Sequence, residues 1–347
     1  MPSAAAARFA AAAALPLLQR LPPETAHELG LRGLRMLQRC WPPREDERTP
    51  KVDAFGLRFA HPVGLAAGFD KNGDYLDALG ALGFSHIEVG TVTPRPQLGN
   101  PSPRLFRLRK ARALINRMGF NNKGADYVAE QLKRASWRGI RGVSIGKNAD
   151  TPLDRAAGDY LACLRTLYAV ADYFAINVSS PNTQGLRDLQ AAQALEDIVA
   201  ALQKERRLLQ ARHGRQVPLL VKISPDLEPA EMHGLCEVLA KSRIDGVIAT
   251  NSSTNLPGFE AELRARQGGG ISGAPLEQKS LEVLRRLRLG LGTGFPIISV
   301  GGLMNADGVV NRLIEGASLV QLYTGFVYRG PALLEEILER LNPPPRR

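Results

Sequence analysis

Cysteine and paired histidines are scarce in this sequence. The chain holds three cysteines, Cys40, Cys163 and Cys236, which lie far apart and form no C-x-x-C pair. A disulfide framework or a cysteine-based metal site is therefore not expected, and a reducing compartment is the simpler interpretation. The five histidines are scattered and show no H-E-x-x-H spacing. The sequence thus predicts that the protein binds no metal.

A long, uninterrupted apolar segment is also missing. Residues 4–18 are rich in alanine but are interrupted by Arg8 and Pro16. A helix that crosses a bilayer needs about 20 predominantly apolar residues, so we expect no transmembrane anchor here. A cleaved signal or transit peptide is one alternative, because small residues are abundant. A helical or irregular leader is the favoured interpretation.

Acidic residues are fewer than basic ones, 34 against 45, which gives a formal net charge of +11. Such a charge suits nucleic acid, an anionic membrane surface, or an anionic substrate or cofactor. Most of the positive charge is spread along the chain and indicates a solvated basic surface. One basic cluster contains no acid, and its members are Arg104, Arg107, Arg109, Lys110 and Arg112.

The segment after the leader has the spacing of an amphipathic helix. Apolar residues fall at positions 26, 29, 30, 33, 34, 37 and 41, and arginines line the other side at 32, 35 and 39. The prolines at 42 and 43 should stop the helix, and residues 44–48 read as a linker. Such a helix suits an anionic membrane surface, and docking on the rest of the protein is the alternative. We therefore divide the chain into an amphipathic element, residues 1–48, and a catalytic domain, residues 49–347.

Eight short apolar runs separated by helical patterns follow from residue 51 onward. Continuous apolar runs are typical of buried parallel strands, and alternation of strand and helix indicates a parallel sheet. Eight repeats predict an α/β fold, a (β/α)8 TIM barrel with a small amino-terminal helical extension. An open, doubly wound sheet is the second choice, because no G-x-G-x-x-G opens the first strand–helix turn. The runs are 63–67, 87–89, 142–145, 173–178, 219–223, 246–250, 297–300 and 319–323.

Polar or glycine-rich residues follow each of these runs. In a barrel the carboxyl ends of all strands meet at one rim, where active sites lie. Glycines at 268–270 and 273, at 301–302 and at 325 lie where barrels often bind phosphate through backbone N–H groups. The sequence therefore predicts a phosphate site near the last two strands.

Lys222 lies inside the apolar run 219–223. A buried lysine needs a partner, because burying an unpaired charge is unfavourable. A fixed cation of this kind can stabilise negative charge on a reduced flavin ring. The alternative is a structural ion pair with an acid on a neighbouring strand.

Residues 177–182, N-V-S-S-P-N, end the fourth run. Asparagine side chains offer a donor and an acceptor together, which suits a ligand with amide groups. Ser180 can act as a general base if its proton passes on to water or to a neighbour. Acyl transfer is not expected, because no G-x-S-x-G elbow is present. A simple Asx or Ser turn is the alternative.

Taken together, these motifs resemble the dihydroorotate dehydrogenase family, in particular its quinone-dependent, membrane-associated class. The match runs in order from about residue 22 to residue 340. The matching segments are 66–71, 90–97, 103–107, 116–120, 145–148, 177–182, 221–223, 250–251, 269–273, 300–302 and 323–325. Ser144 departs from the family pattern, which has asparagine at that position.

The resemblance implies oxidation of (S)-dihydroorotate to orotate in de novo pyrimidine biosynthesis, with FMN as cofactor and a quinone as electron acceptor. Ser180 would be the catalytic base, taking a proton from C5 of the substrate while a hydride leaves C6. The implied FMN-binding residues are Ala67, Gly68, Phe69, Asp70, Lys71, Thr91, Ser144, Asn177, Lys222, Thr250, Gly273, Gly302, Tyr323 and Thr324. The implied substrate-binding residues are Lys71, Asn116, Arg117, Met118, Gly119, Phe120, Asn177, Asn182, Asn251 and Ser252. The implied quinone-site residues are His27 and Arg107.

Serine at the base position and the amphipathic leader indicate the quinone class, because the soluble class has cysteine there. We therefore expect a monomer, peripheral on the cytoplasmic side of a bacterial inner membrane. Its expected partners are dihydroorotate and orotate, a membrane quinone and the anionic membrane surface, without nucleic acid. Three alternatives are a soluble dehydrogenase that uses fumarate or NAD, a flavin-dependent dihydrouridine synthase, and a non-enzymatic basic binding module. The synthase should show a cysteine acid and an added RNA-binding domain, and neither is evident.

Overall fold

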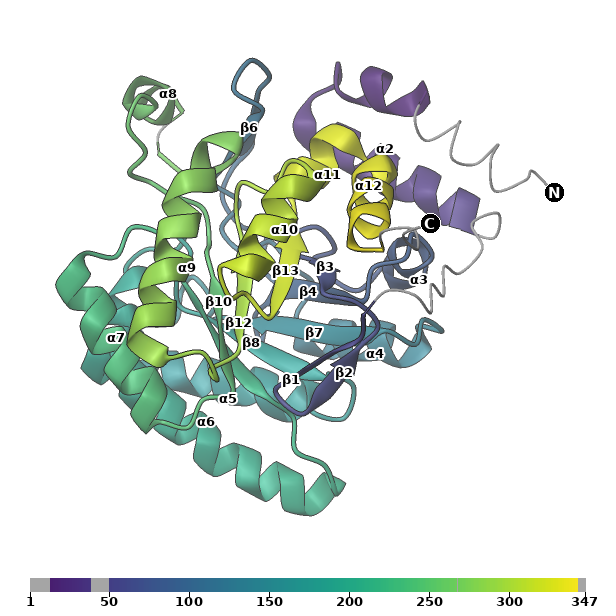
Figure 1. Ribbon diagram of the computed structural model, residues 1–347. Helices are drawn as coiled ribbons and strands as arrows, with labels where there is room; N and C mark the ends of the chain where they lie inside the picture. Colours follow the sequence, from purple (N-terminus) through teal and green to yellow (C-terminus); the bar gives the residue numbers. More distant parts are fainter. Residues whose placement is uncertain (1–12, 39–49, 267, 343–347) are drawn as a thin grey trace, which may run out of the picture.

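The computed structural model describes residues 13–38, 50–266 and 268–342. Eight parallel strands close into a barrel in the order β10-β12-β13-β3-β4-β7-β8-β9 (Figure 1). Each of the eight predicted runs forms one barrel strand, so the predicted fold is confirmed. The strands are β3 Val63–Leu65, β4 His86–Val92, β7 Ile140–Ile145, β8 Tyr173–Asn177, β9 Leu219–Ile223, β10 Gly246–Ala249, β12 Ile297–Val300 and β13 Leu319–Leu322.

The burial of the strands explains their sequence pattern. Every residue of β8 and of β9 is buried, so neither strand has a solvated face that would favour alternation. The register places Asn177, the last residue of β8, beside Lys222 of β9. The two side chains therefore reach the same level of the barrel, near its carboxyl end.

An outer ring of helices surrounds the strands (Figure 1). Neighbours along the ring pack against each other, as α5 does on α6 and α7 on α9. The helices of the barrel domain are α3 Leu76–Gly80, α4 Ala125–Arg134, α5 Ala156–Leu167, α6 Ala192–His213, α7 Pro229–Lys241, α8 Glu260–Ala265, α9 Glu277–Leu291, α10 Ala306–Ile314, α11 Thr324–Arg329 and α12 Pro331–Leu341. Short 3-10 helices, η2 Leu153–Arg155, η3 Leu186–Gln190 and η4 Ala274–Leu276, lie in the connections.

A hairpin closes the amino-terminal end of the barrel. Strands β1 (Val52–Ala54) and β2 (Leu57–Phe59) pair antiparallel. Phe59 is fully buried, and its ring contacts Phe55 and His86 edge-on, with centroids 5.6 and 5.2 Å apart. Because His86 begins β4, the hairpin covers this end of the barrel.

A small sheet stands over the carboxyl end, and the sequence did not predict it. Its strands are β5 (Leu105–Leu108), β6 (Ala113–Asn116) and β11 (Gly270–Gly273), in the order β11-β6-β5. All pairs are antiparallel. The sheet joins two connections more than 150 residues apart in the chain, and it walls one side of the open end.

The amino-terminal extension packs beside this sheet. Residues 13–18 are helical, and α2 (Pro23–Leu37) contacts α3 and β5. The carboxylate of Glu24 in α2 lies 3.0 Å from Arg104 Nε, and this ion pair fixes the start of the helix. The predicted helix is confirmed, although α2 ends at Leu37, before the expected proline stop. The predicted linker, 44–48, falls outside the described residues.

Helix α2 also keeps apolar side chains in solvent. Ala26 and Leu31 are buried against the barrel, whereas Leu29 and Met36 are exposed. Docking therefore accounts for only part of its apolar surface. Within the described ranges, none of the helices is both long enough and apolar enough to cross a membrane.

Candidate active site

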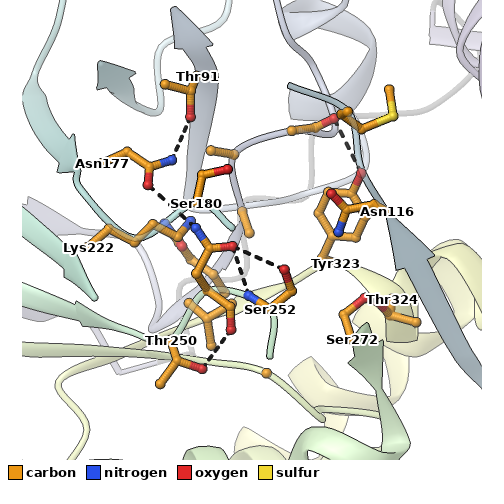
Figure 2. A pocket seen from close by; sticks show the side chains of 18 of the residues that line it. Thr91, Asn116, Asn177, Ser180, Lys222, Thr250, Ser252, Ser272, Tyr323 and Thr324 are labelled. Carbon is orange, nitrogen blue, oxygen red and sulfur yellow. Dashed lines mark hydrogen bonds between the residues drawn. The ribbon is translucent and has the colours of Figure 1, made fainter. Parts of the chain in front are cut away.

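The carboxyl ends of seven barrel strands meet in one pocket. Side chains approach it from opposite sides, with Thr91, Asn177 and Lys222 on one and Ser272 and Thr324 on the other (Figure 2). Strand β7 is the exception, because none of its residues lines the pocket. Phe120 covers its end, since a Cβ added at the following Gly146 would lie 2.9 Å from that ring.

Asparagine side chains form a hydrogen-bonded group at one side of the pocket. Asn177 Nδ2 donates to Thr91 Oγ1 at 2.8 Å, and Asn182 Nδ2 donates to Asn116 Oδ1 at 2.8 Å. Asn251 Nδ2 donates to Ser179 Oγ at 3.0 Å. Asn182 Oδ1 is buried and has no partner in the described part of the chain. An unsatisfied buried acceptor is unfavourable, so this atom marks a position for a ligand donor.

Ser180 lies in the loop that follows β8 and lines the pocket. Its hydroxyl oxygen accepts the backbone N–H of Asn182 at 3.3 Å. The O–H therefore stays available for a ligand. Ser180 as a whole is only 5% exposed, which limits the access of bulk water to a proton transfer at this oxygen.

Lys222 pairs with Glu88 beneath the pocket. Its Nζ lies 3.2 Å from Glu88 Oε1, and the other carboxylate oxygen accepts from Tyr173 Oη and Gln321 Nε2 at 3.1 and 3.0 Å. Burial and the neighbouring Glu88 hold the pKa of Tyr173 well above its usual value, so its phenol stays protonated. Gln321 is part of the pocket lining. Its Oε1 is buried and lacks a hydrogen-bond partner among the described residues. The network thus offers a cation and a free acceptor to a ligand above it.

Lys71 supplies a second cation, from the loop after β3. Its Nζ donates to the carbonyl of Gly68 at 2.8 Å. Burial lowers the pKa of Lys71 to about 8, with Glu24 opposing the shift and Arg104 adding to it. The group is therefore mostly charged at neutral pH and suits an anionic ligand.

Close backbone packing forms the far side of the pocket. A Cβ added at Gly302 would lie 2.2 Å from Glu277 Cα, and one at Gly325 would lie 2.1 Å from the Leu303 carbonyl oxygen. Only glycine fits at these two positions, one in the loop after β12 and one in the first turn of α11, and the close contacts bring the starts of α9 and α11 against that loop. Helix starts carry N–H groups without intrahelical partners and attract anions. Residues 302–303 and 324–325 thus fit a phosphate group.

A second, mostly apolar pocket lies between α2 and the barrel. Its lining comes from both helical segments of the extension and from α11. His27 Nε2 contacts the carbonyl oxygen of Phe69 at 2.8 Å, and this contact requires that nitrogen to carry the hydrogen. Burial and the charge of Lys71 lower the pKa of His27 to about 3, so the ring is neutral.

Arg107 provides the charge of this second pocket. Its Nη1 donates to the carbonyl oxygens of Gln19 and Leu21 at 2.7 and 3.1 Å. Its Nε is buried and has no acceptor within the described residues. Burial also lowers the pKa of this guanidinium. An apolar cavity with one unpaired N–H donor suits an apolar ligand that carries a carbonyl oxygen.

The two pockets share one wall. Tyr323 is the single described residue that lines both. Its hydroxyl donates to the Gly68 carbonyl at 3.3 Å, and its ring meets Phe69 edge-on with centroids 5.7 Å apart. A polar, cation-bearing chamber and an apolar chamber are therefore separated by a single aromatic side chain.

Comparison with known proteins identifies the family. A family model described as Dihydroorotate dehydrogenase matches residues 50–343. A curated relative, Dihydroorotate dehydrogenase (quinone) from Aromatoleum aromaticum, is 50% identical over 323 residues, which cover 93% of this chain and 92% of the relative. The chain belongs to the dihydroorotate dehydrogenase family. The predicted resemblance is thereby confirmed.

Further relatives agree with this assignment. Dihydroorotate dehydrogenase (quinone) from Alkalilimnicola ehrlichii is 50% identical over 332 residues, covering 94% of this chain and 98% of the relative. The crystal structure of DHODH from Eimeria tenella in complex with ferulenol superimposes with a TM-score of 0.83 at 36% identity, covering 92% of this chain and 90% of that one. The ligand-free form of the same protein gives a TM-score of 0.81 at 37% identity, covering 92% and 94%.

The structure brings most of the expected dihydroorotate dehydrogenase site residues together. His27 and Arg107 line the second pocket. The expected residues that line the first pocket are Ala67, Gly68, Lys71, Thr91, Asn116, Met118, Gly119, Phe120, Asn177, Ser180, Asn182, Lys222, Thr250, Asn251, Ser252, Gly273, Gly302, Tyr323 and Thr324. Their individual roles stay predictions.

Four expected residues lie outside the lining of the first pocket. Phe69 lines the second pocket, where it packs against His27 with ring centroids 4.9 Å apart. The carboxylate of Asp70 accepts the backbone N–H groups of residues 73 and 75 at 2.9 and 2.8 Å, and it thereby holds its own loop. Ser144 Oγ faces Thr91 Oγ1 at 2.9 Å, one layer away from the pocket. Arg117 Nε donates to the Pro103 carbonyl at 3.2 Å and points outward.

Glu88 and Gln321 are functional candidates that the sequence reasoning missed. Both lie inside strands that read as apolar runs, and both contact Lys222 or its partner. The sequence contained the information needed to find them, because a charged or polar residue within a buried run needs a partner. The same argument identified Lys222.

The described part of the chain contains no cluster of metal-binding side chains. Across residues 13–38, 50–266 and 268–342, no three His, Cys, Asp or Glu side chains converge as a metal site would require. Cys163 and Cys236 are buried free thiols, and Cys40 falls outside the described residues. The absence of metal stays a prediction.

Proposed function

We propose that this chain oxidises (S)-dihydroorotate to orotate in the first pocket and passes the electrons to a quinone in the second. The single observation that carries the proposal is the shared wall, in which Tyr323 separates a polar chamber from an apolar one. The two half-reactions need such a pair of chambers, because dihydroorotate is a soluble anion and a quinone is an apolar molecule. Family membership supplies the reaction type.

The first pocket fits FMN as the cofactor. The closely packed glycines at 302 and 325 suit its phosphate, and Lys222 suits the negative charge of its reduced ring. The unpartnered Gln321 Oε1 suits a ring N–H donor. Thr91, Asn177 and Thr250 add hydroxyl and amide groups to the same chamber. When bound, FMN supplies the hydride acceptor of the reaction.

The chain itself holds the substrate and moves its proton. Lys71 pairs with the carboxylate of dihydroorotate, and the asparagine group binds its amide edges. Ser180 Oγ takes the proton from C5 and passes its own hydroxyl proton on to water or to a neighbouring group. The C6 hydrogen leaves with its electron pair as a hydride, and the C5–C6 double bond of orotate forms. The buried setting of Ser180 limits the access of bulk water to the reacting atoms during this step.

The second pocket suits the quinone and its route from the membrane. Arg107 Nε is available as a donor to a quinone carbonyl, and the neutral ring of His27 forms part of the mostly apolar lining around it. The exposed Leu29 and Met36, with Arg32 and Arg35 on the same helix, suit an anionic bilayer surface. The protein is then peripheral, on the cytoplasmic side of a bacterial inner membrane, and acts as a monomer that binds no nucleic acid.

Anaerobic titration of the purified protein tests this proposal. Dihydroorotate should bleach the flavin absorbance, and a quinone added afterwards should restore it. Mass spectrometry of the released cofactor should give FMN. A colourless protein, or a flavin that dihydroorotate leaves oxidised, would refute the assignment.

A further inference from the structure

A cluster of charged residues lies behind the first pocket, and the proposed reaction does not use it. Its centre is Asp226, which follows β9 and does not line the pocket. The side chain is 9% exposed. One carboxylate oxygen accepts from Lys279 Nζ and Ser253 Oγ, both at 2.5 Å. The other accepts from Arg187 Nη1 at 3.0 Å and from the backbone N–H of Thr254 at 2.8 Å.

Arg187 connects this centre to the loop that carries the proposed base. Arg187 lies in η3, at the end of the loop after β8. Its Nε donates to the carbonyl of Ser179 at 3.4 Å, and its Nη2 donates to the carbonyl of Ser252 at 3.2 Å. Ser179 precedes Ser180 in the chain, and Ser252 lines the pocket itself. One guanidinium therefore holds two rim loops at the points where they enter the pocket.

Asp226 determines where that guanidinium lies. The carboxylate belongs to a third loop, and Lys279 reaches it from a fourth element, α9. Two cations thus face one carboxylate, so removal of its charge leaves Arg187 and Lys279 repelling each other across a partly buried site. Hydrogen bonds from Lys279, Ser253 and Thr254 outweigh burial and hold the pKa of Asp226 below its usual value. The carboxylate is therefore ionised at neutral pH.

A second contact supports the same arrangement. Gln190, three residues after Arg187, accepts the backbone N–H of Ser224 at 2.8 Å. The hydroxyl of Ser224 in turn accepts the backbone N–H of Asp226 at 3.1 Å. The loop after β9 and the helical turn η3 are therefore joined at two places, and Asp226 is held in the correct position for Arg187.

We propose that Asp226 and Arg187 are positioning residues, which hold Ser180 at the distance from C5 that proton removal requires. Neither residue touches the pocket, and both act through the carbonyls of Ser179 and Ser252. Small displacements of a reacting group reduce rates strongly, by up to about 100-fold for roughly 1 Å. The proposal rests on the proposed function, because it takes Ser180 as the base.

The test compares the two half-reactions in stopped-flow experiments with the full-length holoenzyme. Asp226→Asn and Arg187→Gln should each slow flavin reduction by dihydroorotate about 10- to 100-fold. Both should leave reoxidation of the reduced flavin by quinone unchanged, because the second pocket lies on the other side of Tyr323. The double variant should be no slower than the worse single variant, since the two residues act as a unit. Asp226→Glu should recover part of the rate.

Deuterium at C5 of dihydroorotate separates positioning from a general loss of structure. Misplacement of the base makes proton removal slower relative to the other steps, so the C5 isotope effect on flavin reduction should rise in Asp226→Asn. Arg165→Gln is the matched control, because Arg165 forms a two-point ion pair with Glu205 between α5 and α6, away from the pocket. That variant should match the parent in both half-reactions.

Each outcome decides the proposal. Equal reduction rates and equal isotope effects in the parent and both single variants overturn it, as does an equal slowing of both half-reactions. If Asp226→Asn does not retain flavin, Arg187→Lys replaces it in the comparison, because Arg187 is the more exposed of the two side chains. This variant should likewise slow only the reduction of the flavin by dihydroorotate. A parent enzyme that dihydroorotate does not reduce would instead refute the proposed function, which is a separate result.

Discussion

Lys222 Nζ lies 3.2 Å from Glu88 Oε1, and both side chains are buried inside the barrel. The sequence left two interpretations of Lys222 open, a cation for a reduced flavin and a structural ion pair. The structure shows an ion pair, although its acid lies on β4 and not on a strand beside β9 as expected, and it also places Lys222 in the lining of the first pocket. The two interpretations are therefore compatible, and the negative charge of Glu88 becomes part of the electrostatics of the site.

Glu88→Gln should raise the reduction potential of the bound flavin. Without the carboxylate, the charge of Lys222 is uncompensated and stabilises a negative reduced ring more strongly. A tenfold change in the reduction equilibrium corresponds to about 30 mV for a two-electron couple, and we expect a shift of at least that size. A spectroscopic redox titration measures it. Tyr173→Phe removes one neutral hydrogen bond to Glu88 and should move the potential much less. An unchanged or lower potential in Glu88→Gln would contradict the prediction.

Ser180→Ala should slow reduction of the flavin by dihydroorotate by about 10²–10⁴, the usual contribution of a general base. The hydroxyl is the proposed proton acceptor, and no other group takes its place after truncation. Stopped-flow absorbance measures the rate directly. Ser180→Cys retains an ionisable group, with an ordinary pKa of about 8.5, and should be less impaired. Undiminished reduction in Ser180→Ala would remove Ser180 from the mechanism.

The kcat/KM for dihydroorotate should fall as the pH rises through about 8. Burial lowers the pKa of Lys71 to about 8, so the ammonium that pairs with the substrate carboxylate is lost above that pH. A lysine with a lowered pKa is charged below that value and neutral above it, which sets the direction of the effect. Profiles of kcat/KM between about pH 6 and 10 report this free-enzyme ionisation. In Lys71→Gln the decline near pH 8 should disappear together with most of the affinity. If kcat/KM of Lys71→Gln still declined with a midpoint near pH 8, the ionisation would belong to another group.

Deletion of residues 1–48 should spare reduction of the flavin by dihydroorotate and impair turnover with quinone. The deletion removes α2, and with it much of the lining of the second pocket, while the first pocket is built from the barrel and its loops. Arg107→Leu tests the same idea in the full-length chain, because it removes the unpartnered Nε donor. It should raise the KM for quinone and leave the reductive step unchanged. Full quinone activity in the truncated protein would refute the assigned role of the extension.

The sequence predicted the barrel well, for a physical reason. Parallel strands that are covered on both faces, such as 173–177 and 219–223, are continuous apolar runs that can be recognised without knowledge of their neighbours. The polar residues at their carboxyl ends then follow from the geometry of any closed barrel. Most of the first pocket was therefore predictable from local patterns together with the family resemblance.

The parts that escaped prediction depend on contacts between distant segments. The sheet β11-β6-β5 pairs Ile115 with Ile271. Neither segment alone is long enough to be recognised as a strand from the sequence. Glu88 meets Lys222 across the barrel, 134 positions away in the chain. The end of β7 was expected at the open rim, but Phe120 folds over it from another connection. Local patterns do not contain this information, because it arises only when the chain is packed.

The partition formed by Tyr323 has a kinetic consequence. A soluble metabolite and a lipid-dissolved oxidant can occupy the protein at the same time, because neither has to leave before the other arrives. Only electrons need to cross the phenol ring. A compound that fills the chamber under α2 should then compete with the oxidant and be indifferent to the metabolite concentration. Saturation of one chamber leaves the other free to bind its own ligand, so a single chain can respond independently to the concentration of the metabolite and to that of the oxidant.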